Sequence, residues 1–208
     1  MQADGLATWL RAAAHALELP PVAAPWNLAE LEGCVDVAAM RAAAVLVGVV
    51  PRPAGASVLL TRRTDDLRHH AGQVSFPGGR IEPEDSSPAP AAVREAVEEV
   101  GLVPAQVQPL GYLDPLATIT GFRVQPVLAL VAPDYVPSPA PGEVADIFEV
   151  PLSLLLDPAQ LEQTVIQFGG KTRCVFQYRY TPQRIWGATA SILFNLRQRL
   201  ATANHGRV

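Results

Sequence analysis

The sequence is poor in cysteine, in long apolar runs and in surplus positive charge, and each shortage excludes a class of protein. Cys34 and Cys174 are the only cysteines, and neither belongs to a CxxC pair. A disulfide scaffold or a zinc site is therefore not expected. No apolar run has the length of about 20 residues that a membrane-spanning helix needs. Because the N-terminal stretch also lacks the pattern of a secretory signal, we expect a soluble cytoplasmic protein.

The charge balance bears on the partners of the protein. The 208-residue chain has a formal net charge of −4, whereas a general nucleic-acid binder carries a basic surplus. We therefore expect neither nucleic acid nor a membrane as a partner, although a local basic pocket for a phosphorylated ligand is compatible with this charge. Hydrophobic residues make up 49% of the chain and charged residues 17%, which is enough apolar material for one well-packed domain with additions.

Strand patterns dominate the middle of the chain, and helical patterns lie on either side of them. Apolar residues at helical spacing predict a helix over residues 5–17, and a proline-rich stretch over 20–27 predicts an irregular tether. We therefore expect an N-terminal helical extension over residues 1–40 and the main domain over 41–204. The further elements predicted are strands at 43–50, 57–61, 107–113, 123–131, 143–150, 165–169 and 173–180, and helices at 151–156 and 187–201. This order predicts an α/β fold in which a mixed sheet lies between helices.

The most informative feature is an acidic helix that reads Arg94-Glu-Ala-Val-Glu-Glu-Val-Gly-Leu. Glu95, Glu98 and Glu99 stand at positions i, i+3 and i+4, so a helix projects all three carboxylates from one side. Like charges at this spacing repel one another, and they are either tolerated in solvent or neutralised by a cation. Mg²⁺ prefers carboxylate oxygens and works with few protein ligands together with substrate phosphates. The pattern thus favours a metal-dependent hydrolase that acts on a pyrophosphate.

The boundaries of this helix predict which way the carboxylates face. Asp85, Ser86 or Ser87 can cap its start, and Gly101 is a stop signal. Its apolar stripe comprises Ala92, Val93, Ala96, Val97 and Val100. Because this stripe should face the core, we expect the carboxylates to point away from the core, towards the space in front of Gly78 and Gly79. The simpler alternative is a solvated helix face with an Arg94–Glu98 pair, and the glycines in register on both sides argue against it.

The helix and the loop before it resemble the Nudix box. The half from Arg94 to Leu102 matches the box, with Ala96 as a small version of its first aliphatic residue. In the front half this chain has one extra residue between Asp85 and Arg94. The role of the first glutamate of the box would then fall to Asp85, for which a helix cap is the simpler alternative.

A second resemblance narrows the family. The segments 59–64 and 68–79, the latter reading Arg-His-His-Ala-Gly-Gln-Val-Ser-Phe-Pro-Gly-Gly, resemble the motif upstream of the box in coenzyme A diphosphatases. Residues 186–190 resemble the C-terminal segment of that branch. The resemblance implies a Nudix fold and the hydrolysis of coenzyme A to 4′-phosphopantetheine and adenosine 3′,5′-bisphosphate, with Mg²⁺ or Mn²⁺ as cofactor.

Roles for the site residues follow from these resemblances together with the chemistry. Glu95 and Glu99, one turn apart, are predicted metal ligands, and Glu98 is either a third ligand or the base that deprotonates water. Arg94 is expected to pair with a neighbouring carboxylate and hold it in place. The glycines permit a close approach of the backbone, which makes the Gly79 carbonyl a further candidate ligand. Glu143 is a candidate base or ligand, because other Nudix enzymes supply a glutamate from a comparable loop; an ordinary surface acid is the alternative.

Cations upstream of the glycines are the candidate substrate-binding residues. The group comprises Arg62, Arg63, Arg68, His69 and His70, to which the backbone of Gly78 is added. Coenzyme A carries a 3′-phosphate besides its pyrophosphate, so a cluster of cations suits it as a small-molecule substrate. An exposed polar loop is the alternative for this group.

Two other functions and an oligomer remain open at this stage. One is a Nudix hydrolase of another nucleoside diphosphate derivative, such as ADP-ribose or a modified nucleotide. The other is a Nudix-fold module that senses a nucleotide without cleaving it, against which the presence of all three box carboxylates argues. A homodimer is compatible with the sequence.

Overall fold

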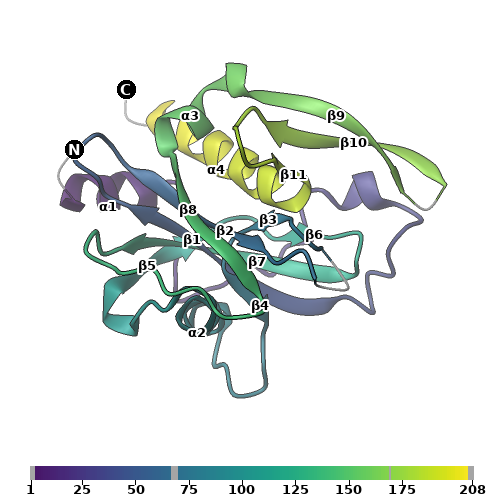
Figure 1. Ribbon diagram of the computed structural model, residues 1–208. Coiled ribbons are helices and arrows are strands. Elements are labelled where there is room, and N and C mark those ends of the chain that lie inside the picture. Colours follow the sequence, from purple (N-terminus) through teal and green to yellow (C-terminus); the bar gives the residue numbers. More distant parts are fainter. Residues whose placement is uncertain (1–2, 67–69, 169, 206–208) are drawn as a thin grey trace.

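A mixed sheet lies between helices in the computed structural model, which describes residues 3–66, 70–168 and 170–205. Helix α2 (Pro88–Val100) covers one face of the sheet, and helix α4 (Gly187–His205) covers the other together with a smaller sheet (Figure 1). Helices α1 (Ala3–Arg11) and α3 (Leu152–Leu156) lie on the α4 side. Among the residues described, no helix combines the length and the apolar character that crossing a membrane requires.

The large sheet has the strand order β3-β2-β1-β7-β5, while β4 pairs with β1, β6 with β7 and β8 with β2. Its strands are β1 (Arg41–Val50), β2 (Ser57–Arg63), β3 (Val74–Ser75), β4 (Gly78–Arg80), β5 (Val107–Tyr112), β6 (Leu116–Ala117), β7 (Phe122–Val131) and β8 (Val144–Pro151). The β1–β7 pair is parallel, from Arg41 opposite Phe122 to Val49 opposite Leu130, and the other pairs are antiparallel. The predicted mixed sheet between helices is therefore confirmed.

The smaller sheet has the strand order β11-β10-β9. Its strands are β9 (Leu161–Phe168), β10 (Lys171–Tyr178) and β11 (Ile185–Trp186), and short 3₁₀ turns occur at η1 (Leu28–Leu31), η2 (Pro104–Gln106) and η3 (Pro158–Gln160). β9 and β10 form the predicted hairpin. This sheet packs on α4, where the rings of Phe176 and Phe194 stack with their centroids 4.5 Å apart.

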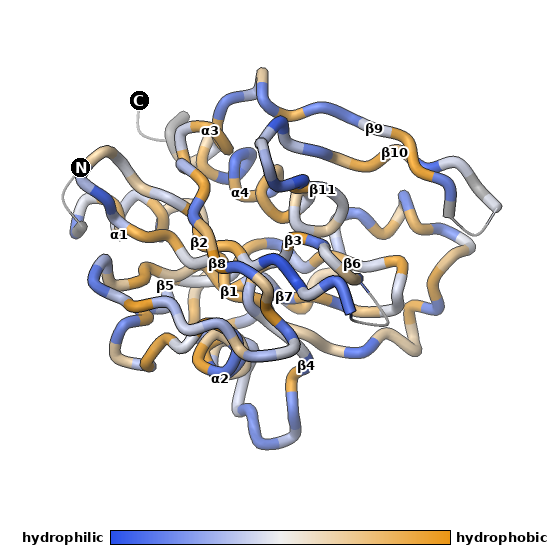
Figure 2. The backbone as a smooth tube through the Cα atoms, in the orientation of Figure 1, coloured by the Kyte–Doolittle hydropathy of each residue, from blue (hydrophilic) through white to orange (hydrophobic). Residues whose placement is uncertain are grey.

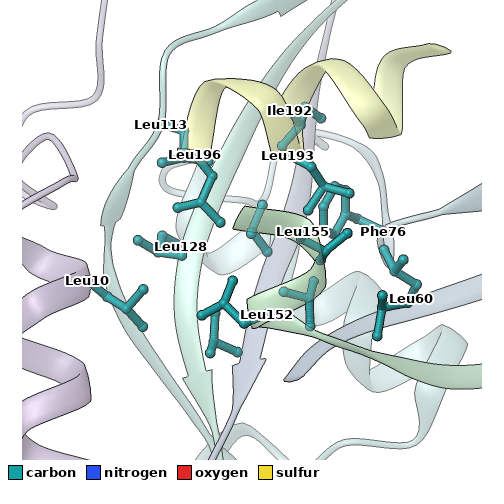
Figure 3. Close-up of a cluster of buried hydrophobic side chains, with 14 of the residues drawn as sticks. Leu10, Leu60, Phe76, Leu113, Leu128, Leu152, Leu155, Ile192, Leu193 and Leu196 are labelled. Carbon is teal, nitrogen blue, oxygen red and sulfur yellow. The ribbon is translucent and has the colours of Figure 1, made fainter. Parts of the chain in front are cut away.

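The apolar runs of the central strands are buried on both faces, because the sheet is covered on both sides. Side chains of β1 alternate: Ala44 and Leu46 join the cluster under α2, while Val47 and Val49 join the cluster under α4. The hydrophobic stretches of the chain accordingly run through the centre of the molecule (Figure 2). The larger cluster, drawn in Figure 3, includes Leu10, Leu60, Phe76, Leu113, Leu128, Leu152, Leu155, Ile192, Leu193 and Leu196.

The N-terminal segment is packed against the main body. The predicted helix is shorter than expected, because α1 ends at Arg11, after which the backbones of His15 and Tyr112 exchange hydrogen bonds of 2.8 and 3.0 Å. Leu6 and Leu10 are buried in the cluster under α4. Residues 20–27 contain no helix or strand, as predicted. The domain boundary at residue 40 stays a prediction, while the first 40 residues contribute to the common core.

Helix α2 has the predicted boundaries, but its burial differs from the prediction. Its N-cap is Ser87, one of the three candidates, so Asp85 lies outside the helix, and Gly101 ends it in the left-handed conformation with φ of 76°. Ala92, Ala96 and Val100 are buried as expected, whereas Val93 and Val97 are only half-buried. Glu99 is buried as well, with an exposed fraction of 5%. The expectation that all three carboxylates point away from the interior is therefore wrong for Glu99.

A pair of leucine substitutions tests the described core. Leu128→Ala removes a side chain that is 0% exposed, and it is expected to lower the free energy of unfolding by about 3 kcal/mol through the cavity it leaves. Leu19→Ala, at a leucine that is 76% exposed, is the matched control and should change it by less than about 0.5 kcal/mol. Urea unfolding followed by circular dichroism measures both values. Equal effects of the two substitutions would contradict the core assignment.

Candidate active site

The predicted metal residues lie where helix α2 passes strand β4. β4 pairs with β1, so that Gly79 stands opposite Ala44 and Gly78 opposite Val45. A Cβ atom on Gly79 would lie 2.4 Å from a carboxylate oxygen of Glu95, and one on Gly78 would lie 2.4 Å from the carbonyl oxygen of Ala44. Position 78 therefore requires glycine, because the backbone of β1 leaves no room for a side chain, whereas a side chain at position 79 would displace the Glu95 carboxylate.

Glu99 is the buried member of the acidic helix face. The amide of Gly78 donates a hydrogen bond of 3.2 Å to its Oε2, and Nη1 of Arg63 lies 4.0 Å from its Oε1. The pKa of Glu99 is raised to about 7, chiefly by burial, and the negative charges of Glu95 and Glu143 contribute to this rise. The amide and the guanidinium act in the opposite direction. The carboxylate thus sits in a place where a negative charge is only partly compensated.

Glu95 lies one turn before Glu99 on the same side of α2, and its side chain is 16% exposed. Nη1 of Arg94 donates to Oε1 of Glu95 at 2.9 Å. Burial is nevertheless the larger influence and raises the pKa of Glu95, and the charges of Glu98 and Glu143 act in the same direction. Two neighbouring carboxylates, one buried and one half-buried, whose pKa values are raised, have a strong electrostatic preference for a cation between or beside them.

Arg94 connects strand β4 and the loop after it to the carboxylates of helix α2. Its Nη2 donates at 3.0 Å both to the carbonyl oxygen of Arg80 and to Oδ2 of Asp85, while its Nη1 reaches Glu95 and Glu98. The predicted pairing of Arg94 with a neighbouring carboxylate is present. The surrounding acids raise the pKa of Arg94, and its guanidinium lowers the pKa of Asp85.

Asp85 has a part in the site that the sequence did not predict. It caps no helix and does not face Glu99; it pairs with Arg94 and accepts a hydrogen bond of 2.9 Å from the amide of Glu82. The extra residue between Asp85 and Arg94 therefore fits into the loop without breaking the contact between them. One indication of the Asp85–Arg94 pair was present in the sequence, which was the acidic residue Asp85 near the end of the lengthened loop before α2.

Glu98 is separated from the other two helix carboxylates. Its side chain is 58% exposed, and its Oε2 lies 3.3 Å from Nη1 of Arg94. Within the described ranges, no group of three or more histidine, cysteine, aspartate or glutamate side chains is arranged to hold a metal ion. The arrangement brings Glu95 and Glu99 together beside Gly79 and leaves Glu98 on the outer side. Two buried carboxylates and a nearby carbonyl are oxygen donors, which is the chemistry that suits a hard divalent cation.

Glu143 is brought to the same region by backbone hydrogen bonds. The amide of Ala140 donates to the carbonyl oxygen of Glu99 at 3.0 Å, and the amide of Thr64 donates to that of Glu143 at 3.0 Å. The side chain of Glu143 is exposed, yet its charge contributes to the raised pKa values of both Glu95 and Glu99. Its catalytic role stays a prediction.

The cations proposed to bind substrate are not one cluster. Arg63 lies beside Glu99, and its Nε is buried without a hydrogen-bond partner. Arg62 pairs with Asp65 at 2.9 Å, and Nδ1 of the exposed His70 lies 2.9 Å from Oε1 of Gln73. Arg68 and His69 lie outside the described residues. Of the described cations in this group, Arg63 is therefore the one that the fold brings to the carboxylates.

Sequence comparison identifies the family. Residues 40–186 match the NUDIX domain. The chain belongs to the NUDIX family. It is 44% identical over 158 residues to the uncharacterized Nudix hydrolase NudL of Yersinia enterocolitica, covering 76% of this chain and 80% of that protein. It is 40% identical over 156 residues to the NudL protein of Escherichia coli K12, covering 75% and 81%.

Among solved structures, the chain is similar to the crystal structure of the Nudix hydrolase RenU from M. smegmatis. The two are 29% identical, the similarity covers 54% of this chain and 71% of that one, and the TM-score is 0.47. The matched family and the mixed sheet between helices agree on a Nudix fold. The acidic helix and the glycines before it lie within the matched residues.

The buried carboxylate of Glu99 makes a pH dependence of stability testable. In the unfolded chain its pKa is near the ordinary value of 4.5 and in the fold it is about 7, so the folded state binds the proton more tightly. This contribution is fully present below the unfolded pKa and is lost as the pH rises through about 7. Without divalent cations, Tm should therefore fall from about pH 5 to about pH 8 more steeply in the parent protein than in Glu99→Gln.

Added Mg²⁺ provides the second half of this test. At the higher pH it should raise Tm of the parent protein and leave Tm of Glu99→Gln nearly unchanged, because a cation that binds the folded state stabilises it. Glu18→Gln, at an exposed glutamate of the N-terminal segment, is the matched control and should behave like the parent. If Tm changed with pH and Mg²⁺ in the same way in all three proteins, Glu99 would not be a ligand of the metal.

Proposed function

We propose that this protein hydrolyses the pyrophosphate of coenzyme A. Water adds across the P–O–P bridge, one phosphorus takes the hydroxyl oxygen, and the bridging oxygen leaves with the other, giving 4′-phosphopantetheine and adenosine 3′,5′-bisphosphate. The observation that carries the proposal is the buried Glu95–Glu99 pair against Gly78 and Gly79, with Arg63 4.0 Å from Glu99. Membership of the NUDIX family supports a hydrolase of nucleoside diphosphate derivatives. The choice of coenzyme A depends on the resemblance of residues 59–64 and 68–79.

A divalent cation, Mg²⁺ or Mn²⁺, would be held by Glu95, Glu99 and the carbonyl of Gly79. When bound, such a cation offsets the charge of a pyrophosphate and lowers the pKa of water. The raised pKa of Glu99 supports this assignment, since a buried carboxylate that resists ionisation gains most from a cation. Arg94 keeps Glu95 in place through the 2.9 Å hydrogen bond and is itself fixed by Asp85.

Two carboxylates are proposed as the base that takes the proton from the attacking water. Glu98 is exposed to solvent and lies next to Arg94. Glu143 lies on the segment that is bonded to the last turn of α2. Both are ionisable oxygen acceptors on the exposed side of the Glu95–Glu99 pair, where a water molecule has access.

Arg63 is the residue best placed to bind a substrate phosphate. Its guanidinium lies next to Glu99, and its buried Nε has an unused N–H. A phosphate oxygen accepts from such a group more strongly than water does, because both partners are charged. The other phosphate is proposed to contact Arg62, Arg68 and His70. The amide of Gly78, also proposed to bind substrate, donates its hydrogen bond to Glu99 in the described structure.

A substrate panel with product analysis tests the choice of substrate. With Mg²⁺ or Mn²⁺ present, kcat/KM for coenzyme A is expected to exceed that for ADP-ribose by at least about tenfold. The reason is that the 3′-phosphate of coenzyme A can make additional charge-assisted hydrogen bonds with the protein. Chromatography should detect 4′-phosphopantetheine and adenosine 3′,5′-bisphosphate in equal amounts. If coenzyme A is cleaved no faster than ADP-ribose, the proposal of coenzyme A as substrate is wrong. The protein would then be a Nudix hydrolase with a different substrate.

Substitution of the buried carboxylate tests the site. Glu99→Gln keeps the shape of the side chain and removes its charge, so kcat should fall by about 100-fold or more with any substrate of the panel. Glu18→Gln controls for a neutralised glutamate that is remote in sequence and exposed. Circular dichroism checks that both variants are folded. Full activity in folded Glu99→Gln would refute its assignment as a metal ligand.

A further inference from the structure

The segment from residue 133 to residue 143, here termed the strap, connects β7 to β8 and is fixed at its beginning. Nη1 of Arg52 donates to the carbonyl oxygen of Pro133, and the hydroxyl of Tyr135 donates to Oε1 of Glu149 at 2.9 Å. Arg52 also pairs with Glu149, through a hydrogen bond of 3.0 Å from Nε to Oε2. The start of the strap is thus attached to the β1–β2 turn and to β8.

The middle of the strap is bonded to the end of helix α2. The amide of Ser138 donates to the carbonyl oxygen of Val100 at 2.7 Å, and the amide of Ala140 donates to the carbonyl oxygen of Glu99 at 3.0 Å. The last carbonyls of a helix have no partner within the helix, so these bonds satisfy two groups that would otherwise lack one. They also tie the strap to the residue whose carboxylate lies in the site.

The end of the strap is bonded to Thr64, directly after β2. The hydroxyl of Thr64 donates to the carbonyl oxygen of Gly142 at 3.0 Å, and its amide donates to the carbonyl oxygen of Glu143 at 3.0 Å. The preceding residue is Arg63, whose guanidinium lies 4.0 Å from Glu99. The strap therefore links the backbone of Glu99 to the surroundings of its carboxylate. Ala140 in the strap is bonded to the backbone of Glu99, and Glu143 at the end of the strap is bonded to Thr64. The neighbour of Thr64 is Arg63, which lies beside the Glu99 carboxylate.

Hydrogen bonds rather than packing fix this end of the strap. Residues 141–143 are exposed, and Val136 earlier in the strap is 77% exposed, so burial contributes little here. Gly142 also adopts a positive φ of 85°, where a non-glycine residue would be strained. Since Thr64 makes two of the contacts to Gly142 and Glu143, loss of its hydroxyl should widen the range of positions open to Glu143.

We propose that Thr64 is a positioning residue, whose hydroxyl fixes the end of the strap and so holds Glu143 beside the last turn of α2. This inference rests on the proposed function, in which Glu143 takes part in hydrolysis. The bonds from Ala140 to Glu99 and from Thr64 to Glu143 place the end of the strap between the last turn of α2 and the end of β2. Because Thr64 acts through Glu143, its effect on the reaction should exist only while the Glu143 carboxylate is present.

A double-mutant cycle separates this role from a general structural one. Thr64→Val has the same shape without the hydroxyl and is expected to lower kcat for coenzyme A about tenfold, since small displacements of a reacting group are costly. KM should change less than about twofold, as substrate binding is not the step affected. Thr64→Ser restores the hydroxyl and should recover most of kcat. In a Glu143→Gln background, Thr64→Val should have no further effect.

The possible results distinguish failure of this inference from failure of the proposed function. An equal loss of kcat from Thr64→Val in both backgrounds, or no loss in the parent background, overturns the positioning role. Loss of activity in Thr64→Ser equal to that in Thr64→Val overturns it too. Absence of hydrolysis by the parent protein with coenzyme A rejects the proposed substrate, and the cycle is then run with the substrate of the panel that is cleaved. Thermal melting of all variants identifies any loss of fold.

Discussion

Burial of the Glu99 carboxylate is the constraint on which the rest of the site depends. Two groups meet this carboxylate: the amide of Gly78 and the guanidinium of Arg63. Helix α2 also lies so close to β4 that a side chain at position 79 would displace the Glu95 carboxylate. A buried charge with incomplete compensation is unfavourable to the fold by itself. The divalent cation proposed for this site would complete the charge balance.

The sequence predicted those parts of the fold that depend on one segment at a time. The apolar runs of β1 and β7 indicated strands, and Gly101 marked the end of α2. It failed for Glu99 because residues 98 and 99 differ by about 100° around a helix, so a face of three glutamates spans a wide arc. Glu98, at one end of this arc, is exposed to solvent, whereas Glu99, at the other end, is buried next to Gly78.

Contacts between distant segments were beyond the reach of sequence patterns. Arg62 and Arg63 are neighbours in the chain, but successive side chains of a strand point to opposite faces. One consequently meets Asp65 and the other Glu99. The strap illustrates the same limit, because nothing in the spacing of its prolines revealed that its amides would bond to α2. A cluster of like residues in the sequence is therefore not a cluster in space.

The pairing of Asp85 with Arg94 has a consequence for how this site tolerates insertions. The two ends of the segment between β4 and α2 are attached to the same guanidinium, one through the carbonyl of Arg80 and the other through Asp85. The side chains of Glu82 and Glu84 between them are exposed. An added residue in this segment is therefore compatible with the site as long as an acid still reaches Arg94.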